Sequence, residues 1–165
     1  MRKLKIKIKL LDKECMPEIH GDWMDAKCLN DTIIKATSDA TLVSLGIAIE
    51  LPKGYEAIIA NRSNSARGIK RPNGERVEPF FNPNGIGVID NSYCGNNDIW
   101  HNVVKPLRGD VILKRGDRIC QFRIQLSQFA TPWQKFKDLF YNGIEFIVVD
   151  NLNNNNRGGF GHSGI

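Results

Sequence analysis

The sequence predicts an all-β protein, built as a barrel or a sandwich, with one short helix. Residues 3–11 alternate strictly between lysines and apolar side chains, which is the two-residue period of a half-buried strand. Short runs rich in Ile and Val follow along the chain, separated by turns that contain Pro, Gly, Asn or Asp. Many short strands with few helices are typical of β-barrels and β-sandwiches.

The first strand is expected over residues 3–11, where the lysines face solvent and discourage pairing along a sheet edge. Seven further strands are expected, in chain order, at TLVSLGIAIEL, YEAIIAN, GIGVID, DIWHNVV, DVILK, ICQFRIQL and EFIVVD. Residues 66–85, ARGIKRPNGERVEPFFNPNG, are rich in turn residues and predict a long irregular excursion.

The segment TPWQKFKDLFYNG predicts the helix. It opens with Thr131 and Pro132, an N-cap and first-turn pair, and it ends at an Asn-Gly pair. Trp133, Phe136 and Phe140 fall at helical spacing. The helix is therefore expected to be amphipathic and to cover a strand edge or one end of the barrel.

The chain has 165 residues, enough for one domain with its own core, which we place at residues 1–150. Residues 151–165, NLNNNNRGGFGHSGI, have almost no apolar content to bury, so a flexible C-terminal lid is expected there. No apolar run approaches the ~20 residues of a membrane span. The lysine-rich N-terminus also lacks the unbroken apolar stretch of a signal peptide. These features predict a cytoplasmic protein without a membrane partner.

The net charge of +5 is compatible with a phosphate-bearing ligand. The N-terminal lysines form a solvated strand face, and no basic patch is interleaved with aromatic residues, so direct nucleic-acid binding is not expected. The four cysteines form no CxxC pair. Cys15, His20 and Cys28 match no common zinc spacing, which favours free thiols over a metal site.

Several features could each contact a phosphate or a water molecule, although none is specific alone. Arg62 and Ser63 follow an expected strand, where an arginine fork and a hydroxyl can grip phosphate oxygens. The glycines of RGGFG permit close approach of the backbone to an anion. In GVIDNSYCGNND an apolar strand delivers the carboxylate of Asp90 and the phenol of Tyr93 into a turn rich in Gly and Asn.

Five segments taken in order resemble the five motifs of the homotrimeric all-β dUTPases: GDWMDAKC, NRSNSA, GVIDNSYCG, RGDRICQ and RGGFGHSG. The resemblance implies a jelly-roll-like subunit and a homotrimer with active sites between subunits, the tail reaching a neighbour's site. It also implies hydrolysis of dUTP to dUMP and pyrophosphate, which limits uracil in DNA and supplies dUMP for dTMP synthesis. The lengthened segments at residues 66–85 and around Trp133 are similar to insertions in phage-borne and Gram-positive bacterial dUTPases.

The resemblance further implies roles for the matching positions around the nucleoside. Asp90 would orient and deprotonate the attacking water, a contribution of about 10²–10⁴-fold. Tyr93 would stack under the deoxyribose and leave no room for a ribose hydroxyl. The main chain at Gly87 and Ile89 would pair with the uracil edge. Asn84 either approaches the uracil through a water molecule or serves only as a turn residue.

Other matching positions would face the triphosphate. Ser63 resembles the serine near the scissile bridge, Gln121 the phosphate-contacting glutamine, and Arg62 a partly structural neighbour. Asp25 resembles an aspartate in the outer shell of Mg²⁺, bound through water, and this metal would neutralise the phosphates. Asp117 and Arg118 are expected to hold a turn. In the tail, the implied substrate contacts are Arg157 at the γ-phosphate, Phe160 over the uracil, and Gly159, Gly161 and Ser163 around the phosphates. His162 either adds a phosphate contact or is a tolerated substitution.

Two alternative functions make different demands on the sequence. A dCTP deaminase of the same fold would need a glutamate in the strand after the Asp90 turn, but NNDIWHNVV has none and carries Trp100 instead. A regulatory or binding protein on the dUTPase scaffold would be indicated by loss of Asp90, Tyr93 or the Gly-rich tail, and all three are present.

Overall fold

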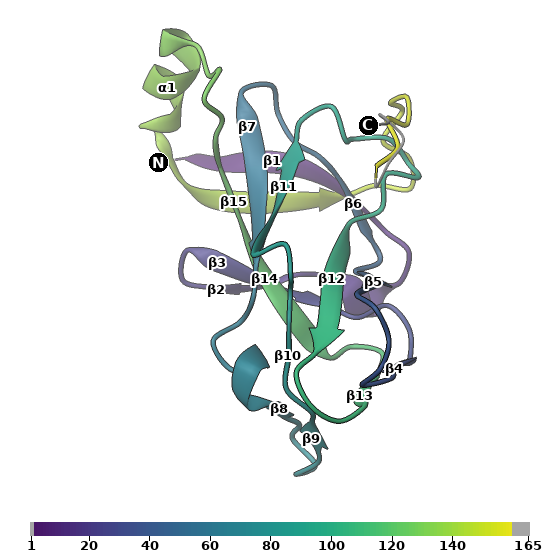
Figure 1. The fold of residues 1–165 in the computed structure, drawn as a ribbon. Helices are drawn as coiled ribbons and strands as arrows, with labels where there is room; N and C mark the ends of the chain where they lie inside the picture. Colours follow the sequence, from purple (N-terminus) through teal and green to yellow (C-terminus); the bar gives the residue numbers. More distant parts are fainter. Residues whose placement is uncertain (1, 160–165) are drawn as a thin grey trace.

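The structure is a computed structural model that describes residues 2–159, whose regular elements are β-strands, two 3₁₀ turns and one α-helix (Figure 1). The largest sheet has the order β11-β7-β14-β3-β2. Its strands are β11 (Ile86–Asp90), β7 (Tyr55–Ala60), β14 (Arg118–Leu126), β3 (Trp23–Lys27) and β2 (Glu18–His20). The prediction of an all-β fold with one short helix is confirmed.

Two three-stranded sheets and two strand pairs complete the fold. The first sheet is β15-β1-β6, with β15 (Tyr141–Val148), β1 (Arg2–Leu10) and β6 (Ile47–Glu50). The second is β10-β12-β5, with β10 (Phe80–Phe81), β12 (His101–Pro106) and β5 (Thr41–Ser44). The pairs are β13 (Val111–Leu113) with β4 (Thr32–Ile34), and β8 (Ile69–Lys70) with β9 (Arg76–Val77). Single 3₁₀ turns lie at Lys13–Cys15 and Ser65–Arg67.

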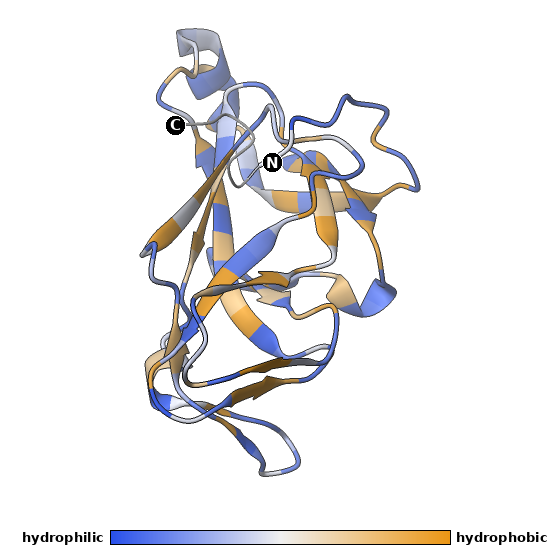
Figure 2. Cartoon of the chain, turned by 45° about the vertical axis from the view of Figure 1, so that its right-hand side comes forward, coloured by the Kyte–Doolittle hydropathy of each residue, from blue (hydrophilic) through white to orange (hydrophobic). Residues whose placement is uncertain are grey.

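Apolar side chains from all three larger sheets form one core. Figure 2 shows hydrophobic and hydrophilic segments alternating along the longer strands, as expected where one face of a strand is buried. Trp100 and Phe122 meet edge to face at the centre of this core, with their ring centroids 5.2 Å apart. No helix in residues 2–159 is long and apolar enough to cross a bilayer.

The predicted N-terminal strand is confirmed, but the expectation that its lysines guard a sheet edge is wrong. Ile6 and Ile8 are buried while the alternating lysines face outward. The strand lies in the middle of its sheet, parallel to β15 and antiparallel to β6. On the exposed face, Lys7 pairs with Glu50 of β6 at 3.2 Å. The lysines therefore make cross-strand ion pairs possible rather than blocking pairing.

The apolar run at residues 41–51 is two strands rather than one. Gly46 has a φ of +65°, and a Cβ there would lie 2.5 Å from the sulfur of Cys15. The chain bends at this glycine, so that β5 and β6 join different sheets. The predicted excursion at residues 66–85 is also more regular than expected, because it holds the β8-β9 pair and β10.

The predicted helix is α1 (Pro132–Asp138), with a capping box between Thr131 and Gln134. Its aromatic face does not cover the barrel within the described chain: Trp133 is 61 % exposed and stacks on Phe136. The side chain of Gln134 contacts the body instead, donating to the carbonyl of Lys53. Strand β15 begins soon after, at Tyr141, which ends the helix earlier than the spacing predicts.

Candidate active site

A cavity of about 560 Å³ lies beside β11 and β12. It is lined by five of the residues that the sequence places around a nucleoside: Asn84, Gly87, Ile89, Asp90 and Tyr93. The tail contributes Arg157, Gly158 and Gly159 to the same cavity. This volume lies within the range of small-molecule pockets in proteins. The structure thus joins the third and fifth sequence motifs in one site.

Asp90 ends β11, and a turn fixes its carboxylate at the cavity. Oδ1 accepts hydrogen bonds from the backbone N–H of Ser92 at 2.7 Å and from the Ser92 hydroxyl at 2.5 Å. The guanidinium of Arg157 pairs with Oδ2. Partial burial raises the pKa of Asp90, but the hydrogen bonds from Ser92 and the Arg157 charge outweigh it, so the pKa lies below its usual value. Asp90 is therefore an ionised, oriented carboxylate at neutral pH.

Tyr93 is held as a rigid wall of the cavity. Its hydroxyl donates to the carbonyl of Ile99 at 3.0 Å, and its backbone N–H donates to the carbonyl of Asp90 at 3.2 Å. Burial, followed by the nearby charge of Asp98, raises the pKa of the phenol, so it stays protonated. A Cβ on Gly159 would lie 3.2 Å from this ring. The backbone of the tail thus passes directly over Tyr93.

A second group, which we call the Arg62 cluster, comprises Asp25, Arg62, Ser63 and Gln121. The Nε of Arg62 donates to Oδ1 of Asp25 at 2.9 Å, and the amide of Gln121 donates to the carbonyl of Asn61 at 3.0 Å. Gln121 is the cross-strand partner of Asp25. Ser63 is exposed in the turn that follows β7. The cluster therefore combines the first, second and fourth sequence motifs.

Asp90 and the Arg62 cluster lie at opposite ends of strands β7 and β11, although the cavity itself extends along β11 as far as Ile86. Asp90 pairs with Glu56, whereas Ile86 pairs with Ala60, just before Arg62. The four residue steps from Glu56 to Ala60 span about 13 Å at strand rise. One chain therefore does not bring Ser63 close to its own Asp90.

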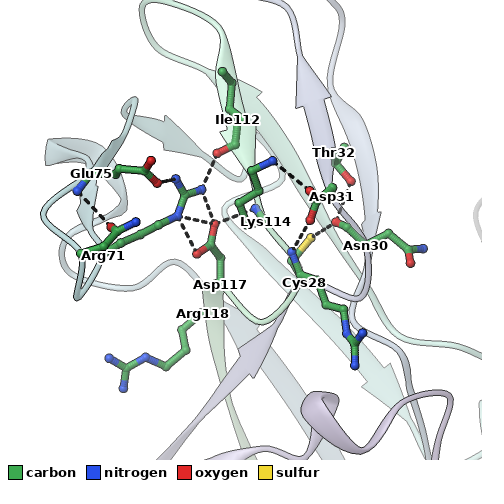
Figure 3. Close-up of polar contacts among 12 residues, drawn as sticks. Cys28, Asn30, Asp31, Thr32, Arg71, Glu75, Ile112, Lys114, Asp117 and Arg118 are labelled. Atoms are coloured by element: carbon green, nitrogen blue, oxygen red, sulfur yellow. Dashed lines mark hydrogen bonds and ion pairs between the residues drawn. The ribbon is translucent and has the colours of Figure 1, made fainter.

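Asp117 holds a turn as expected, whereas the Arg118 side chain makes other contacts (Figure 3). The Asp117 carboxylate accepts from the Arg71 guanidinium at 2.7 Å and from the backbone N–H of Lys114 at 2.8 Å, a purely structural arrangement. Arg118 instead pairs with Glu18 at 3.2 Å and lies 3.5 Å from Asp25. Arg118 thus adds positive charge to the Arg62 cluster.

Substitution Asp25→Asn should lower the free energy of unfolding by about 1–3 kcal/mol, because it removes the charged acceptor of Arg62 from a buried position. Urea denaturation followed by fluorescence would measure this loss. Asp22→Asn is the matched control, since Asp22 is exposed and should change stability little. Equal stability of the two variants would contradict a structural role for the Asp25–Arg62 pair.

The sequence did not reveal Asp98, which holds the tail. Asp98 is only 1 % exposed. Its carboxylate accepts hydrogen bonds from the backbone N–H groups of Arg157 and Gly158, both at 2.9 Å, and from that of Gly95 at 2.8 Å. Burial raises the pKa of Asp98, but these backbone hydrogen bonds outweigh it and lower the pKa overall. Leu152, in the expected lid, is buried as well. Phe160, Gly161, His162 and Ser163 lie outside the described residues.

Among residues 2–159 no group of three His, Cys, Asp or Glu side chains could hold a metal ion by itself. Asp25 is the residue that the sequence analysis links to Mg²⁺, through a water molecule. Arg62 occupies its Oδ1, while Oδ2 has only the longer contacts to Arg118 at 3.5 Å and to His20 at 3.8 Å. This geometry is compatible with a carboxylate that accepts from metal-bound water.

The fold and the cavity define an all-β protein with a cavity of small-molecule size, which is lined by an ionised carboxylate, a tyrosine and an arginine. Comparison with known proteins then specifies the family. The dUTPase family model matches residues 24–164, and the chain belongs to the dUTPase family. It is 39 % identical over 98 % of its length to the SPbeta prophage-derived deoxyuridine 5'-triphosphate nucleotidohydrolase YosS of Bacillus subtilis, covering 99 % of that protein.

Solved structures agree with this assignment at the level of the fold. The Streptococcus mutans dUTPase superposes with a TM-score of 0.61 at 23 % identity, covering 74 % of this chain and 93 % of that one. A point mutant of the dUTPase from phage phi11 of S. aureus, whose structure describes a structural Mg(II) ion, gives a TM-score of 0.58 at 16 % identity, with coverages of 77 % and 92 %. The resemblance to phage-borne and Gram-positive bacterial dUTPases is confirmed.

Proposed function

We propose that this dUTPase hydrolyses dUTP to dUMP and pyrophosphate by attack of a water molecule on the α-phosphate, with Asp90 as the base. The observation that carries the proposal is the ionised Asp90 carboxylate, fixed by Ser92 and directed at a nucleoside-sized cavity. A carboxylate positioned in this way can orient a water molecule and accept its proton. The reaction would limit uracil in DNA and supply dUMP.

Base and sugar recognition follow from the two walls of the cavity. Within the described residues β11 pairs with β7 alone, so the outer edge of β11 has main-chain groups open to a ligand. Gly87 and Ile89 are two residues apart on this edge strand, so their main-chain groups point to the same side of it. A uracil edge would pair there as an added strand does. Asn84 would contact the base through water. Tyr93, fixed by Ile99, would exclude a ribose hydroxyl.

The triphosphate contacts require a second subunit. Asp90 and Ser63 would both have to lie beside the α-phosphate, but they belong to opposite ends of the same sheet. A neighbouring chain in a homotrimer would bring its Arg62 cluster to this cavity, with Gln121 and Ser63 donating to phosphate oxygens and Arg62 adding charge. The negative charge of each nucleotide would thus be balanced by side chains from two subunits.

Mg²⁺ would enter with the triphosphate, whose oxygens supply its direct ligands, while Asp25 accepts from metal-bound water. When bound, the metal neutralises phosphate charge and stabilises the leaving pyrophosphate. From the tail, Arg157 would meet the γ-phosphate and Gly159 would close over the phosphates. Phe160 over the uracil, and Gly161 and Ser163 at the phosphates, complete the proposed lid. The division into a barrel at residues 1–150 and a lid at 151–165, and the cytoplasmic location, stay predictions.

The proposal is tested by pyrophosphate release with Mg²⁺ from dUTP, dCTP, dTTP and UTP, with the products identified by chromatography. Release from dUTP alone, giving dUMP, is expected. Ammonia release from dCTP would favour the deaminase, although the position of the required glutamate holds the buried Trp100. No turnover of any nucleotide by a folded trimer would favour a binding or regulatory protein.

Ending the chain after Asn156 should leave a folded protein whose turnover of dUTP falls by about 10²-fold or more, because charge stabilisation by the arginine is lost. Steady-state kinetics and thermal unfolding would be compared with those of the full chain. An unchanged turnover number would remove the tail from the catalytic machinery.

Substitution Ser92→Ala should move the acid limb of the kcat/KM profile to higher pH. The Ser92 hydroxyl stabilises the ionised form of Asp90, so its loss raises the pKa, and the base is then protonated at a higher pH. Activity at pH 8 should change little. Ser38→Ala, in a turn far along the sequence, is the control whose profile should match the wild type. Overlapping acid limbs for Ser92→Ala and the control would contradict this account of Asp90.

A further inference from the structure

Two asparagine side chains are buried beside the cavity. Asn82 and Asn102 are 4 % and 0 % exposed, and Asn82 also lines the cavity. The Nδ2 of Asn82 donates to Oδ1 of Asn102 on β12 at 3.1 Å. Asparagine is mostly found at protein surfaces, and burying an amide is unfavourable unless it is hydrogen-bonded. Packing alone therefore does not explain this pair.

Asn82 closes the turn that leads into β11. Its Oδ1 accepts from the backbone N–H of Asn84 at 2.9 Å, and its carbonyl accepts from the N–H of Gly85 at 3.0 Å. The sequence Asn-Pro-Asn-Gly suits such a turn, with proline second and a glycine last at a φ of +74°. Strand β11 begins at the next residue, Ile86. The side chain of Asn82 therefore sets the position from which β11 starts.

The Asn82 side chain can adopt only one orientation in this network. The backbone N–H of Asn84 can only donate, so it must face the oxygen of the Asn82 amide. The NH₂ of Asn82 then faces the oxygen of Asn102. The backbone N–H of Asn82 is held as well, since it donates to Oδ1 of Asn61 at 2.9 Å. Buried hydrogen bonds of this kind strengthen one another and rigidify the segment that carries them.

Rigidity at this point of the chain matters for the choice of base. Uracil offers N3–H as a donor and O4 as an acceptor, whereas cytosine offers an acceptor at N3 and an amino donor at C4. Main-chain groups at Gly87 and Ile89 distinguish the two bases only while β11 keeps its position. Within the described residues β11 pairs with β7 alone, so no second strand fixes its outer edge, and the turn at its start is its further support.

We propose that Asn82 is a positioning residue for base selection, which holds the start of β11 so that its main chain accepts uracil and rejects cytosine. The proposal rests on the uracil recognition proposed above and assigns its selectivity to a residue that need not touch the base. Asn102 supports Asn82 from β12, and Asn61 supports it from the end of β7. The carboxylate of Asp90 is held separately by Ser92, so the chemical step does not depend on this network.

Binding of non-hydrolysed analogues of dUTP and dCTP tests the proposal, because the two ligands differ only in the base. Asn82→Ala should weaken binding of the dUTP analogue by about tenfold and leave the weaker binding of the dCTP analogue nearly unchanged. Asn82→Ser is the matched variant, because its hydroxyl can still accept from the N–H of Asn84, and it should keep the base preference within about threefold of the wild type. Asn61→Ala, at a partly exposed position, removes the acceptor of the Asn82 N–H. It should also lower the preference, and it provides the same test if Asn82→Ala does not fold.

Steady-state kinetics add a second readout. Asn82→Ala should raise KM for dUTP while kcat stays within about threefold of the wild type, since Asp90 and Ser92 are intact. An unchanged base preference in Asn82→Ala would overturn the positioning role, and so would equal losses in Asn82→Ala and Asn82→Ser or an equal weakening of both analogues. A wild type that prefers the uracil analogue but does not turn over dUTP would instead overturn the proposed hydrolysis and leave this inference standing. A wild type without base preference would overturn both.

Discussion

Replacing Asp90 with asparagine should reduce turnover of dUTP by about 10²–10⁴-fold, the contribution of a positioned base. Affinity for dUTP should change only slightly, because asparagine has nearly the same shape and its side-chain oxygen can still accept from Ser92. Loss of charge should mainly affect the proton transfer in the transition state. Single-turnover kinetics would give the chemical step, and equilibrium titration with a non-hydrolysed dUTP analogue would give the affinity.

The matched control is Asp39→Asn, which removes an exposed aspartate elsewhere. It should retain wild-type turnover, which would show that removal of one negative charge from the chain does not by itself impair the enzyme. If Asp90→Asn retained turnover within about tenfold of the wild type, less than a positioned base contributes, Asp90 would not be the base. A comparable rise in the dissociation constant would instead assign Asp90 to binding.

The parts of the fold that follow from local patterning could be predicted from the sequence. Alternation of apolar and charged residues located β1, and the Thr131-Pro132 pair located the start of α1. Local patterning failed to predict features of the fold that depend on contacts between residues far apart in the sequence, or on strands too short to show a period. At the bend, Gly46 leaves no room for a side chain because Cys15, far away in the sequence, packs against it. The short strands β2 and β4, three residues each, carry too little periodicity to be recognised.

The site was predictable to the extent that its motifs are contiguous in sequence. Asp90 and Tyr93 belong to one turn, and the structure places both at the cavity. Asp98 was not predictable, because its function depends on backbone donors about 60 residues further along the chain, and no pattern marks a carboxylate that binds main-chain groups. The asparagine-rich composition predicted a flexible lid, and it gave no sign that the side-chain amides make specific hydrogen bonds.

Two inactive variants should restore each other's activity when they are assembled into mixed trimers. Asp90→Asn inactivates the cavity of its own chain. Ser63→Asp places a carboxylate in the Arg62 cluster, where it would repel the triphosphate, and Ser63 is exposed, so the fold should tolerate it. In mixed trimers some sites combine an intact cavity from one chain with an intact cluster from the next. Each mixed trimer has one intact site of three, whichever variant it holds in two copies, so the isolated mixed trimers should show about a third of wild-type activity.

The pairing of Asp90→Asn with Arg157→Ala gives the matched comparison. In this pairing the outcome depends on which chain supplies Arg157 to a site: if the tail serves its own chain, every site carries one defect and activity should stay near that of the variants alone. Co-expression with two affinity tags would isolate mixed trimers, and dUTP turnover would be measured for each pairing. No recovery for Asp90→Asn with Ser63→Asp would contradict the two-chain site, since the separation of about 13 Å along β7 makes a second chain necessary. Recovery in the Arg157 pairing would show instead that the tail crosses to a neighbour, because only then could a site receive an intact Asp90 and an intact Arg157 from different chains.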